Sequence, residues 1–161
     1  PWRNVSGNAA LGLELKGFSE QYIQDKISLY SKDFGLEKYL EYMPHELSGG
    51  LRQRVAFLRS VIVDNPIMLL DEPLGSLDAI TKSTLHEWLM KMFSKFSKTI
   101  IMVTHDIDEA ILLANRVVVM TTNPGRIIKE YLIDRQLVDK RDITSNYFIQ
   151  LKKDIIKDLS L

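Results

Sequence analysis

Apolar residues recur at helical spacing through much of the chain. Within residues 19–34, Ile23, Ile27, Tyr30 and Phe34 follow one another at intervals of four, three and four, which places them on one face of a helix. The same reasoning predicts a short helix near the start of the chain and further helices over 48–63, 79–96, 106–114 and 144–161. Because each predicted helix has one apolar face, we expect each to pack against a core.

Four shorter runs have the composition of β-strands. Residues 67–70 are wholly apolar without alternation, a pattern typical of a strand covered on both faces in a parallel sheet. Residues 99–104 form a second β-rich apolar run. Residues 117–120 and 126–133 flank a tight turn at Pro124, so we expect these two runs to form a hairpin.

The predicted helices and strands are segregated along the sequence. Residues 1–63 contain only predicted helices, whereas residues 64–133 alternate strands with helices. Residues 134–143 carry many charges, and we expect them to be a solvated linker before the last helix. We therefore predict an α/β protein with a helical subdomain over 1–63, an α/β core over 64–133 and a C-terminal linker and helix over 134–161.

Composition and charge narrow the class of protein. Hydrophobic residues make up 45% and charged residues 26% of the 161 positions, which is ordinary for a globular domain. The 21 basic and 21 acidic residues balance, which argues against nucleic acid as a partner. The absence of cysteine excludes disulfides and thiolate metal sites. No stretch approaches the roughly 18 apolar residues of a membrane-spanning helix, so any membrane role requires a partner.

The first candidate site is Ser48-Gly49-Gly50, at the start of the helix predicted over 48–63. The first turn of a helix has unpaired N–H groups and a positive dipole end, glycines let an anion approach the backbone, and a serine hydroxyl adds a donor. These features suit a phosphate group. The alternative is that Ser48 is an ordinary N-cap and the glycines shape a turn, and on this triplet alone the alternative is favoured.

The second candidate site is the acidic pair Asp71-Glu72, which follows the apolar strand. The carboxyl ends of parallel strands border the crevice in which α/β sheets bind ligands. A carboxylate there can hold Mg²⁺ through water, and we assign this role to Asp71. Glu72 can orient or deprotonate an attacking water. Without further context, a solvent-exposed acidic pair is an equally good interpretation.

The third candidate is His105, directly after the run 99–104. We expect it at the same sheet edge as Asp71 and Glu72, where it can bond a terminal phosphate and the attacking water. A single histidine is more often structural or simply exposed, and we interpret the other two histidines of the chain in that way.

The order and spacing of these motifs resemble those of an ABC-type ATPase. LSGG-x-RQR, the strand ending in LLDEP, the triplet SLD at residues 76–78 and the strand ending in TH follow one another as they do in that family. The resemblance implies that LSGG is the signature motif, that the LLDE strand is Walker B, that SLD is the D-loop and that the histidine is the switch histidine. It also implies a partial P-loop NTPase core sheet with a helical subdomain at its N-terminal end.

Roles for individual residues follow from the same resemblance. It implies catalysis by Glu72 and His105, and a Mg²⁺ contact through Asp71. It implies ATP binding by the signature and D-loop residues Ser48, Gly49, Gly50, Leu51 and Asp78. In the family the signature of one subunit faces the ATP of a second subunit, so Ser48 is expected to act in trans and Glu72 in cis.

Two departures from the family pattern bear on activity. Leu51 stands where the signature usually has glutamine, and no G-x-x-x-x-G-K-[ST] loop occurs in the sequence. We therefore expect this chain to be the C-terminal part of a longer ATPase and to be inactive alone. The missing loop's strand belongs inside the family's core sheet, so without it residues 67–71 and 99–104 should expose apolar faces and unpaired strand edges. We expect the exposed edges to be paired by a second copy or by a local rearrangement.

The resemblance implies an ATP-hydrolysing subunit that drives solute import. The sequences DEPLGSLD, PWRNV and NPGR are most similar to importers of nitrate, sulfonate or taurine. Expected partners are a second ATPase subunit, transmembrane permease subunits and, indirectly, a solute-binding protein, at the cytoplasmic face of the membrane. One alternative is a fragment that binds the permease without catalysis. Another is an ABC-type ATPase of DNA repair, which the zero net charge and the lack of a coiled-coil insertion disfavour.

Overall fold

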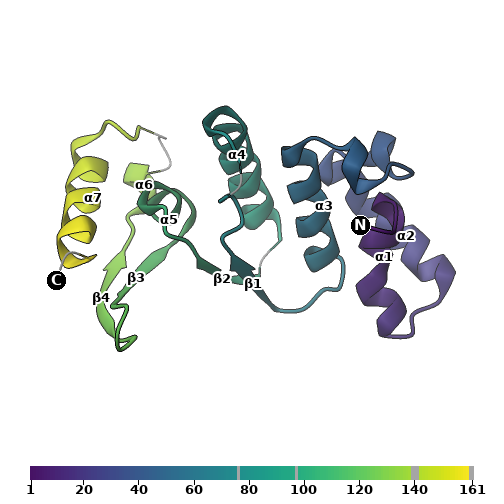
Figure 1. Ribbon diagram of the computed structural model, residues 1–161, viewed down its shortest axis with the longest axis horizontal. Helices are drawn as coiled ribbons and strands as arrows, with labels where there is room; N and C mark the ends of the chain where they lie inside the picture. The colour runs from purple at the N-terminus through teal and green to yellow at the C-terminus, as the bar shows by residue number, and fades with distance from the viewer. Residues whose placement is uncertain (76, 97, 139–141, 160–161) are drawn as a thin grey trace.

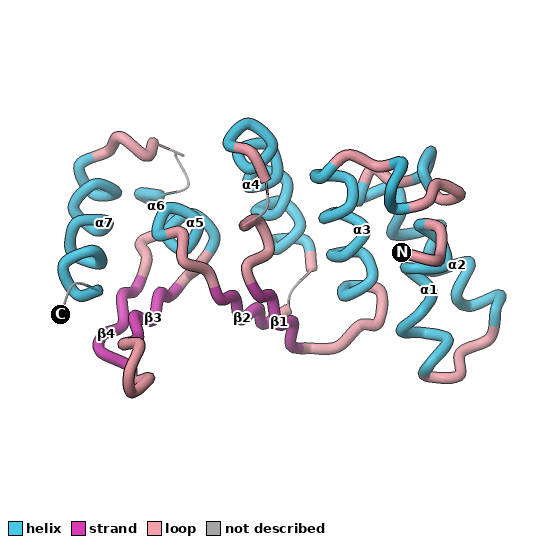
Figure 2. Tube along the Cα trace, viewed as in Figure 1, coloured by secondary structure: helices cyan, strands magenta, loops and turns pink. Residues whose placement is uncertain are grey.

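A computed structural model describes residues 1–75, 77–96, 98–138 and 142–159 of the chain. The elements are arranged in a row, with a helical N-terminal part, a central part of strands and a long helix, and a C-terminal part built on a hairpin (Figure 1). Wherever strands occur, the helices lie on one side of them (Figure 2). No helix among the described residues is both long enough and apolar enough to cross a membrane.

The N-terminal part consists of α1 (Val5–Leu15), α2 (Glu20–Phe34) and α3 (Gly49–Val61), with 3-10 turns at Glu37–Tyr39 and Pro44–Glu46 between α2 and α3. Gly35 ends α2 in a left-handed conformation with φ 64°, which glycine adopts without steric cost. Gly12 lies where α1 closely approaches the chain that follows α3. A Cβ added at this position would be 2.3 Å from Cγ2 of Val63, so a larger residue would clash. The all-helical composition predicted for this part is confirmed.

The central part contains β1 (Ile67–Asp71), α4 (Ala79–Lys95) and β2 (Thr99–Val103). The strands β1 and β2 are parallel, with Asp71 opposite Val103. Only one face of β1 is covered by the described residues, in contrast to the two-faced cover that its apolar run is typical of: Met68 is buried, but Leu69 is 73% exposed. This exposure is the result expected when the strand of the missing loop is absent. The helices α3 and α4 pack on one face only, and an apolar run cannot reveal whether the second face has a cover.

The C-terminal part contains α5 (Ile107–Leu113), β3 (Arg116–Met120), β4 (Ile127–Leu132), α6 (Arg135–Val138) and α7 (Asn146–Leu159). The predicted hairpin is confirmed, since β3 and β4 pair antiparallel and Thr121 N–H donates to the Arg126 carbonyl at 2.9 Å. The predicted solvated linker is wrong in part. It contains α6, and Val138 is 3% exposed because its side chain packs into the C-terminal core.

Two hydrophobic cores hold the chain together. The first core joins the N-terminal and central parts and includes Phe34, Leu58 and Leu89. The second core lies between α5, the hairpin and α7, and consists of Ile111, Val117, Val119, Ile133, Val138, Phe148, Leu151 and Ile155. The helix α5 contributes to both, with Leu113 in the first core and Ile111 in the second.

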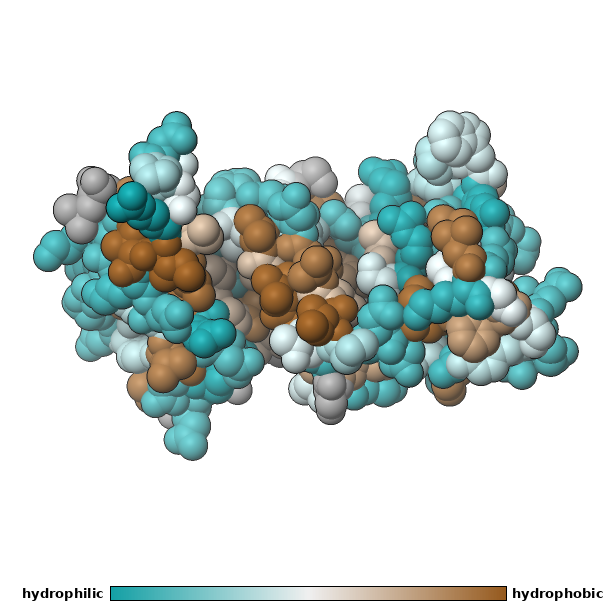
Figure 3. Space-filling view, turned by 90° about the horizontal axis from the view of Figure 1, so that it is seen from below, coloured by the Kyte–Doolittle hydropathy of each residue, from teal (hydrophilic) through white to brown (hydrophobic). Residues whose placement is uncertain are grey.

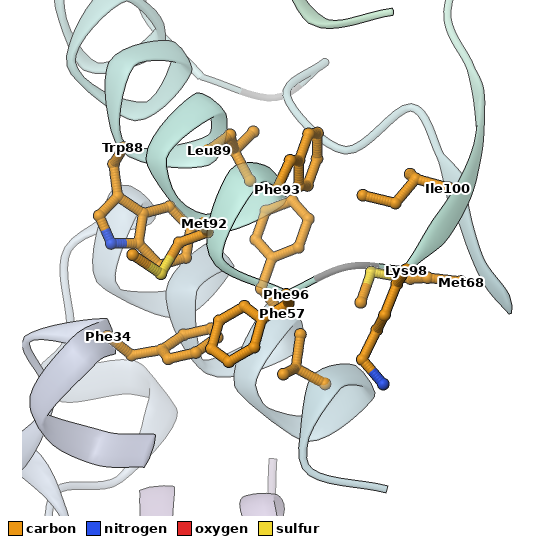
Figure 4. A pocket seen from close by; sticks show the side chains of 11 residues that line it. Phe34, Phe57, Met68, Trp88, Leu89, Met92, Phe93, Phe96, Lys98 and Ile100 are labelled. Carbon is orange, nitrogen blue, oxygen red and sulfur yellow. The ribbon is translucent and has the colours of Figure 1, made fainter. Parts of the chain in front are cut away.

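A small cavity of about 10 Å³ lies inside the first core, where Phe34, Trp88 and Phe96 converge (Figure 4). Lys98 borders it, but the Lys98 ammonium turns outward to the Asp64 carboxylate, 2.9 Å away. A space of this size holds about one water molecule, and its walls are apolar. We interpret it as a packing defect and not as a ligand site.

The opposite face of the β1–β2 pair is open. Ile67, Leu69, Ile101 and Val103, which we call the open sheet face, are 54%, 73%, 53% and 59% exposed. Apolar side chains gather over the centre of the molecule when it is viewed from the strand side (Figure 3). Among the described residues β1 and β2 pair only with each other, so a local rearrangement that pairs their outer edges is not seen.

Candidate functional site

The carboxyl ends of β1 and β2 bring Glu72 and His105 together. Because Asp71 is opposite Val103 in the parallel register, the residues that follow each strand emerge side by side. Glu72 N–H donates to the Val103 carbonyl at 2.9 Å, which prolongs the pairing by one residue. Glu72 then has φ 45°, an unusual value for a side chain other than glycine, and strain of this kind is often found at functional sites.

Both oxygens of the Glu72 carboxylate contact His105. The His105 N–H donates to Oε1 at 3.1 Å, and His105 Nδ1 lies 2.7 Å from Oε2. The hydrogen bond that the His105 imidazole donates to the Glu72 carboxylate, followed by the carboxylate's negative charge, raises the pKa of His105. The His105 and Glu72 side chains are 75% and 40% exposed, so a ligand can reach the pair from solvent. The predicted proximity of these two residues is therefore found in the structure.

Asp71 lies beside this pair and is exposed. Its carboxylate forms no hydrogen bond or ion pair with another described residue, so its oxygens are available to a ligand. In the described parts of the chain no group of three acidic, histidine or cysteine side chains could hold a metal. This arrangement fits Mg²⁺, which commonly uses one or two carboxylates and takes its other ligands from water and phosphate.

The signature segment lies on a different element. Ser48 is the N-cap of α3, and its hydroxyl accepts the N–H of Leu51 at 3.4 Å. An added Cβ on Gly49 would lie 3.0 Å from Leu77, and one on Gly50 would lie 3.2 Å from Thr81. The capping role that we considered as the alternative for Ser48 is thus present, and the glycines also permit the start of α3 to pack against the start of α4.

Asp78 occupies the corresponding position on α4. Its carboxylate caps the helix by accepting the N–H groups of Ile80 and Thr81 at 3.1 and 3.0 Å and the Thr81 hydroxyl at 2.6 Å. These hydrogen bonds lower the pKa of Asp78, and the bond from the Thr81 hydroxyl has the largest effect. The D-loop assignment also includes Ser76, which lies outside the described residues.

The predicted site residues thus form two groups. Asp71, Glu72 and His105 lie at the ends of β1 and β2, while the segment Ser48–Leu51 lies beside the loop that carries Asp78. No hydrogen bond or ion pair within the described part of the chain joins the two groups directly. The catalytic and binding roles of these residues remain predictions.

Sequence analysis did not identify a third set of polar residues behind His105. Glu109 is 1% exposed and lies 3.0 Å from the Lys82 ammonium, which also donates to Asp106 at 3.3 Å. The neighbouring Glu109 carboxylate raises the pKa of Lys82, although partial burial opposes this shift. The sequence signal was a glutamate within the apolar stretch of α5, but its partner lies on another helix and could not be inferred from spacing.

Comparison with known proteins identifies relatives for nearly the whole chain. A model of the ABC transporter family matches residues 4–75. The aliphatic sulfonates import ATP-binding protein of Bacillus cereus is 41% identical over 98% of this chain and 61% of its own length. The nitrate import ATP-binding protein of Synechocystis is 42% identical over 83% of this chain and 50% of its own length.

A solved structure shows the same fold. The dimeric structure of a bacterial ABC transporter cassette is 30% identical, with a TM-score of 0.66 over 83% of this chain and 58% of that chain. This likeness confirms the predicted partial P-loop NTPase core with its helical part. The chain spans less than two thirds of the length of each of these three proteins.

Proposed function

Because the chain belongs to the ABC transporter family, we propose that it forms the signature and Walker B part of a subunit that hydrolyses ATP to drive solute import. The observation that supports this most directly is the Glu72–His105 pair at the joined ends of two parallel strands, with the exposed carboxylate of Asp71 beside it. No G-x-x-x-x-G-K-[ST] loop occurs in the 161 residues. The proposal therefore requires a phosphate-binding loop from a segment outside them.

Hydrolysis transfers the terminal phosphoryl group of ATP to water, giving ADP and phosphate. Glu72 orients the attacking water and accepts its proton, and His105 donates a hydrogen bond to the terminal phosphate. Before ATP binds, the Glu72 carboxylate is occupied by His105, so the approach of nucleotide has to redirect one of these side chains. Asp71 would hold Mg²⁺, which neutralises charge on the phosphate oxygens when it is bound.

The second group of residues serves the ATP of a partner subunit. The first turn of α3 provides a positive dipole end, and Gly49 and Gly50 allow a phosphate to approach their backbone N–H groups, while the Leu51 N–H donates to the Ser48 hydroxyl. Ser48 and Leu51 belong to this turn, and Asp78 lies at the neighbouring start of α4. A second copy of the ATPase subunit is therefore the first partner in the proposal.

The other proposed partners are permease subunits in the membrane, which the helical part contacts, and through them a solute-binding protein. The subunit would then lie peripherally at the cytoplasmic face of the membrane. The relatives' names indicate the import of aliphatic sulfonates, nitrate or taurine, and we propose that the solute is nitrate or a small molecule with a sulfonate group, such as taurine.

The test is ATP hydrolysis by the assembled transporter. Glu72→Gln should lower kcat by about 100- to 10,000-fold, the usual contribution of a general base, while nucleotide binding is retained. Glu130→Gln, on the exposed face of β4, is a matched control and should hydrolyse ATP normally. Wild-type turnover by the Glu72→Gln assembly would contradict the proposal.

The missing phosphate-binding loop favours one further candidate function for the chain by itself, which is binding of the permease without catalysis. A pull-down of the permease by the 161-residue chain, with and without ATP, distinguishes the two. Nucleotide-independent capture without ATP hydrolysis supports the candidate function, whereas hydrolysis that depends on Glu72 excludes it.

A further inference from the structure

We propose that buried Glu109, paired with Lys82, is a positioning residue that holds His105 against Glu72 and couples it to the loop that carries Asp78. The expected effect of this pair on ATP hydrolysis rests on the proposed function. Its structural basis is a set of contacts behind the site, none of which involves a predicted catalytic side chain directly.

Glu109 fixes the residues on both sides of His105. The Thr104 hydroxyl donates to Glu109 Oε2 at 3.0 Å, and the same hydroxyl accepts the backbone N–H of Asp106 at 3.0 Å. The Asp106 carboxylate in turn caps α5 by accepting the N–H groups of Asp108 and Glu109 at 3.0 and 3.2 Å. His105 is therefore the exposed residue between two neighbours that a buried carboxylate holds in place.

Lys82 connects this turn to the other group of site residues. Its ammonium lies 3.0 Å from Glu109 Oε1 and 3.3 Å from Asp106 Oδ2, so it bridges two acidic residues of the α5 turn. Its backbone N–H donates to the Asp78 carbonyl at 2.9 Å in the first turn of α4. The Lys82 side chain thus joins the first turn of α4, which Asp78 caps, to the residues that flank His105.

The burial of Glu109 indicates that the contact has a specific role. Glu109 Oε1 lies 3.0 Å from the Lys82 ammonium but accepts no hydrogen bond within the described part of the chain. The ion pair therefore offsets only part of the desolvation cost of a buried carboxylate, which is on the order of several kcal/mol, and an apolar residue would stabilise α5 equally well. Here the second carboxylate oxygen is used to orient Thr104. The pair therefore provides a defined conformation at His105, which an apolar side chain could not.

The test uses two variants and two measurements. Glu109→Gln removes the charge and keeps the shape, and Lys82→Met removes the ammonium from a side chain that is 21% exposed and tolerates change better. Lys82→Arg is the conservative rescue. Lys95→Met is the matched control, since it breaks a 2.6 Å ion pair with Asp33 at the far end of the same helix.

The first measurement is amide hydrogen exchange in the full 161-residue chain. We expect Glu109→Gln and Lys82→Met to accelerate exchange of the His105 and Asp106 N–H groups by about 10-fold or more, because local opening becomes easier. Lys82→Arg and Lys95→Met should remain within about 2-fold of the wild type on the same scale. This measurement does not depend on ATP hydrolysis, so it decides the inference even if the proposed function fails.

The second measurement is steady-state ATP hydrolysis by the assembled transporter. We expect kcat to fall by about 10-fold in Glu109→Gln and Lys82→Met with KM for ATP within about 2-fold of the wild type, because positioning is lost and ATP contacts are kept. If both variants lower the melting temperature and leave His105 exchange and kcat unchanged, the pair only stabilises the fold and the inference is overturned. If Glu109→Gln does not fold, the same criteria apply to Lys82→Met.

Discussion

The two strand pairs of this protein differ in how their faces are covered. In the hairpin, β3 pairs with β4, the next strand in the chain, and α5 and α7 cover the two strands through the second core. The β1–β2 pair is parallel, needs the long crossover of α4 between its strands, and leaves the open sheet face exposed. The strand pair that carries Glu72 and His105 therefore has one face without a cover from the described residues. The hairpin, in contrast, is covered by helices that are close to it in the sequence.

The largest expected effect comes from removing Phe148, which is 3% exposed in the second core. Phe148→Ala should lower the free energy of unfolding of this region by about 3–5 kcal/mol through lost burial and a cavity. Urea titration followed by the methyl NMR signals of Ile155 measures this change. If the Trp88 fluorescence transition keeps its midpoint, the two cores unfold separately; a joint shift would show that they form one cooperative unit.

The first core is tested by Leu58→Ala, at a side chain with no exposed surface. The free energy of unfolding should fall by about 2–5 kcal/mol, and the Trp88 fluorescence midpoint should move to lower urea. Leu15→Ala, at a side chain that is 81% exposed, is the control with little expected change. An unchanged Trp88 transition in Leu58→Ala would contradict the assignment of the central part to the first core.

A smaller effect is expected at the open sheet face. Leu69→Thr should change the free energy of unfolding by no more than about 0.5 kcal/mol, because Leu69 is exposed and threonine suits a strand. Light scattering should show less self-association of the variant, since an apolar face and free strand edges favour it. Unfolding is measured on the dilute monomer, where a loss of about 2 kcal/mol or more would contradict the exposure of Leu69, as cavity formation has that magnitude.

The smallest effect is the titration of His105. Its pKa is raised by Glu72, so the pair stabilises the fold below the unfolded-state pKa of histidine, and this contribution is lost as pH rises through the higher folded-state value. NMR titration of the His105 imidazole should therefore give a midpoint above the model-peptide value, and Glu72→Gln should return it towards that value. A midpoint that is the same with and without Glu72 would show that the contact does not persist in solution.

Local features of the structure were predictable and longer-range ones were not. The helix faces and the hairpin followed from spacing and turn residues, because these signals involve neighbours in sequence. The proximity of Glu72 and His105 followed from one general rule, that parallel strands end at the same sheet edge. The Lys82–Glu109 pair and the short helix α6 depend on which distant segments pack together, and residue spacing contains no such information.

The position of α5 between the two cores has a mechanical consequence. Ile111 and Leu113 are two residues apart, which is roughly 200° around a helix, so they point to opposite sides. Spinning α5 about its own axis would pull one of them out of its core. The helix can tilt or translate with its neighbours but cannot rotate about its own axis. A reorientation of His105 therefore has to come from backbone torsions in the short turn that precedes α5.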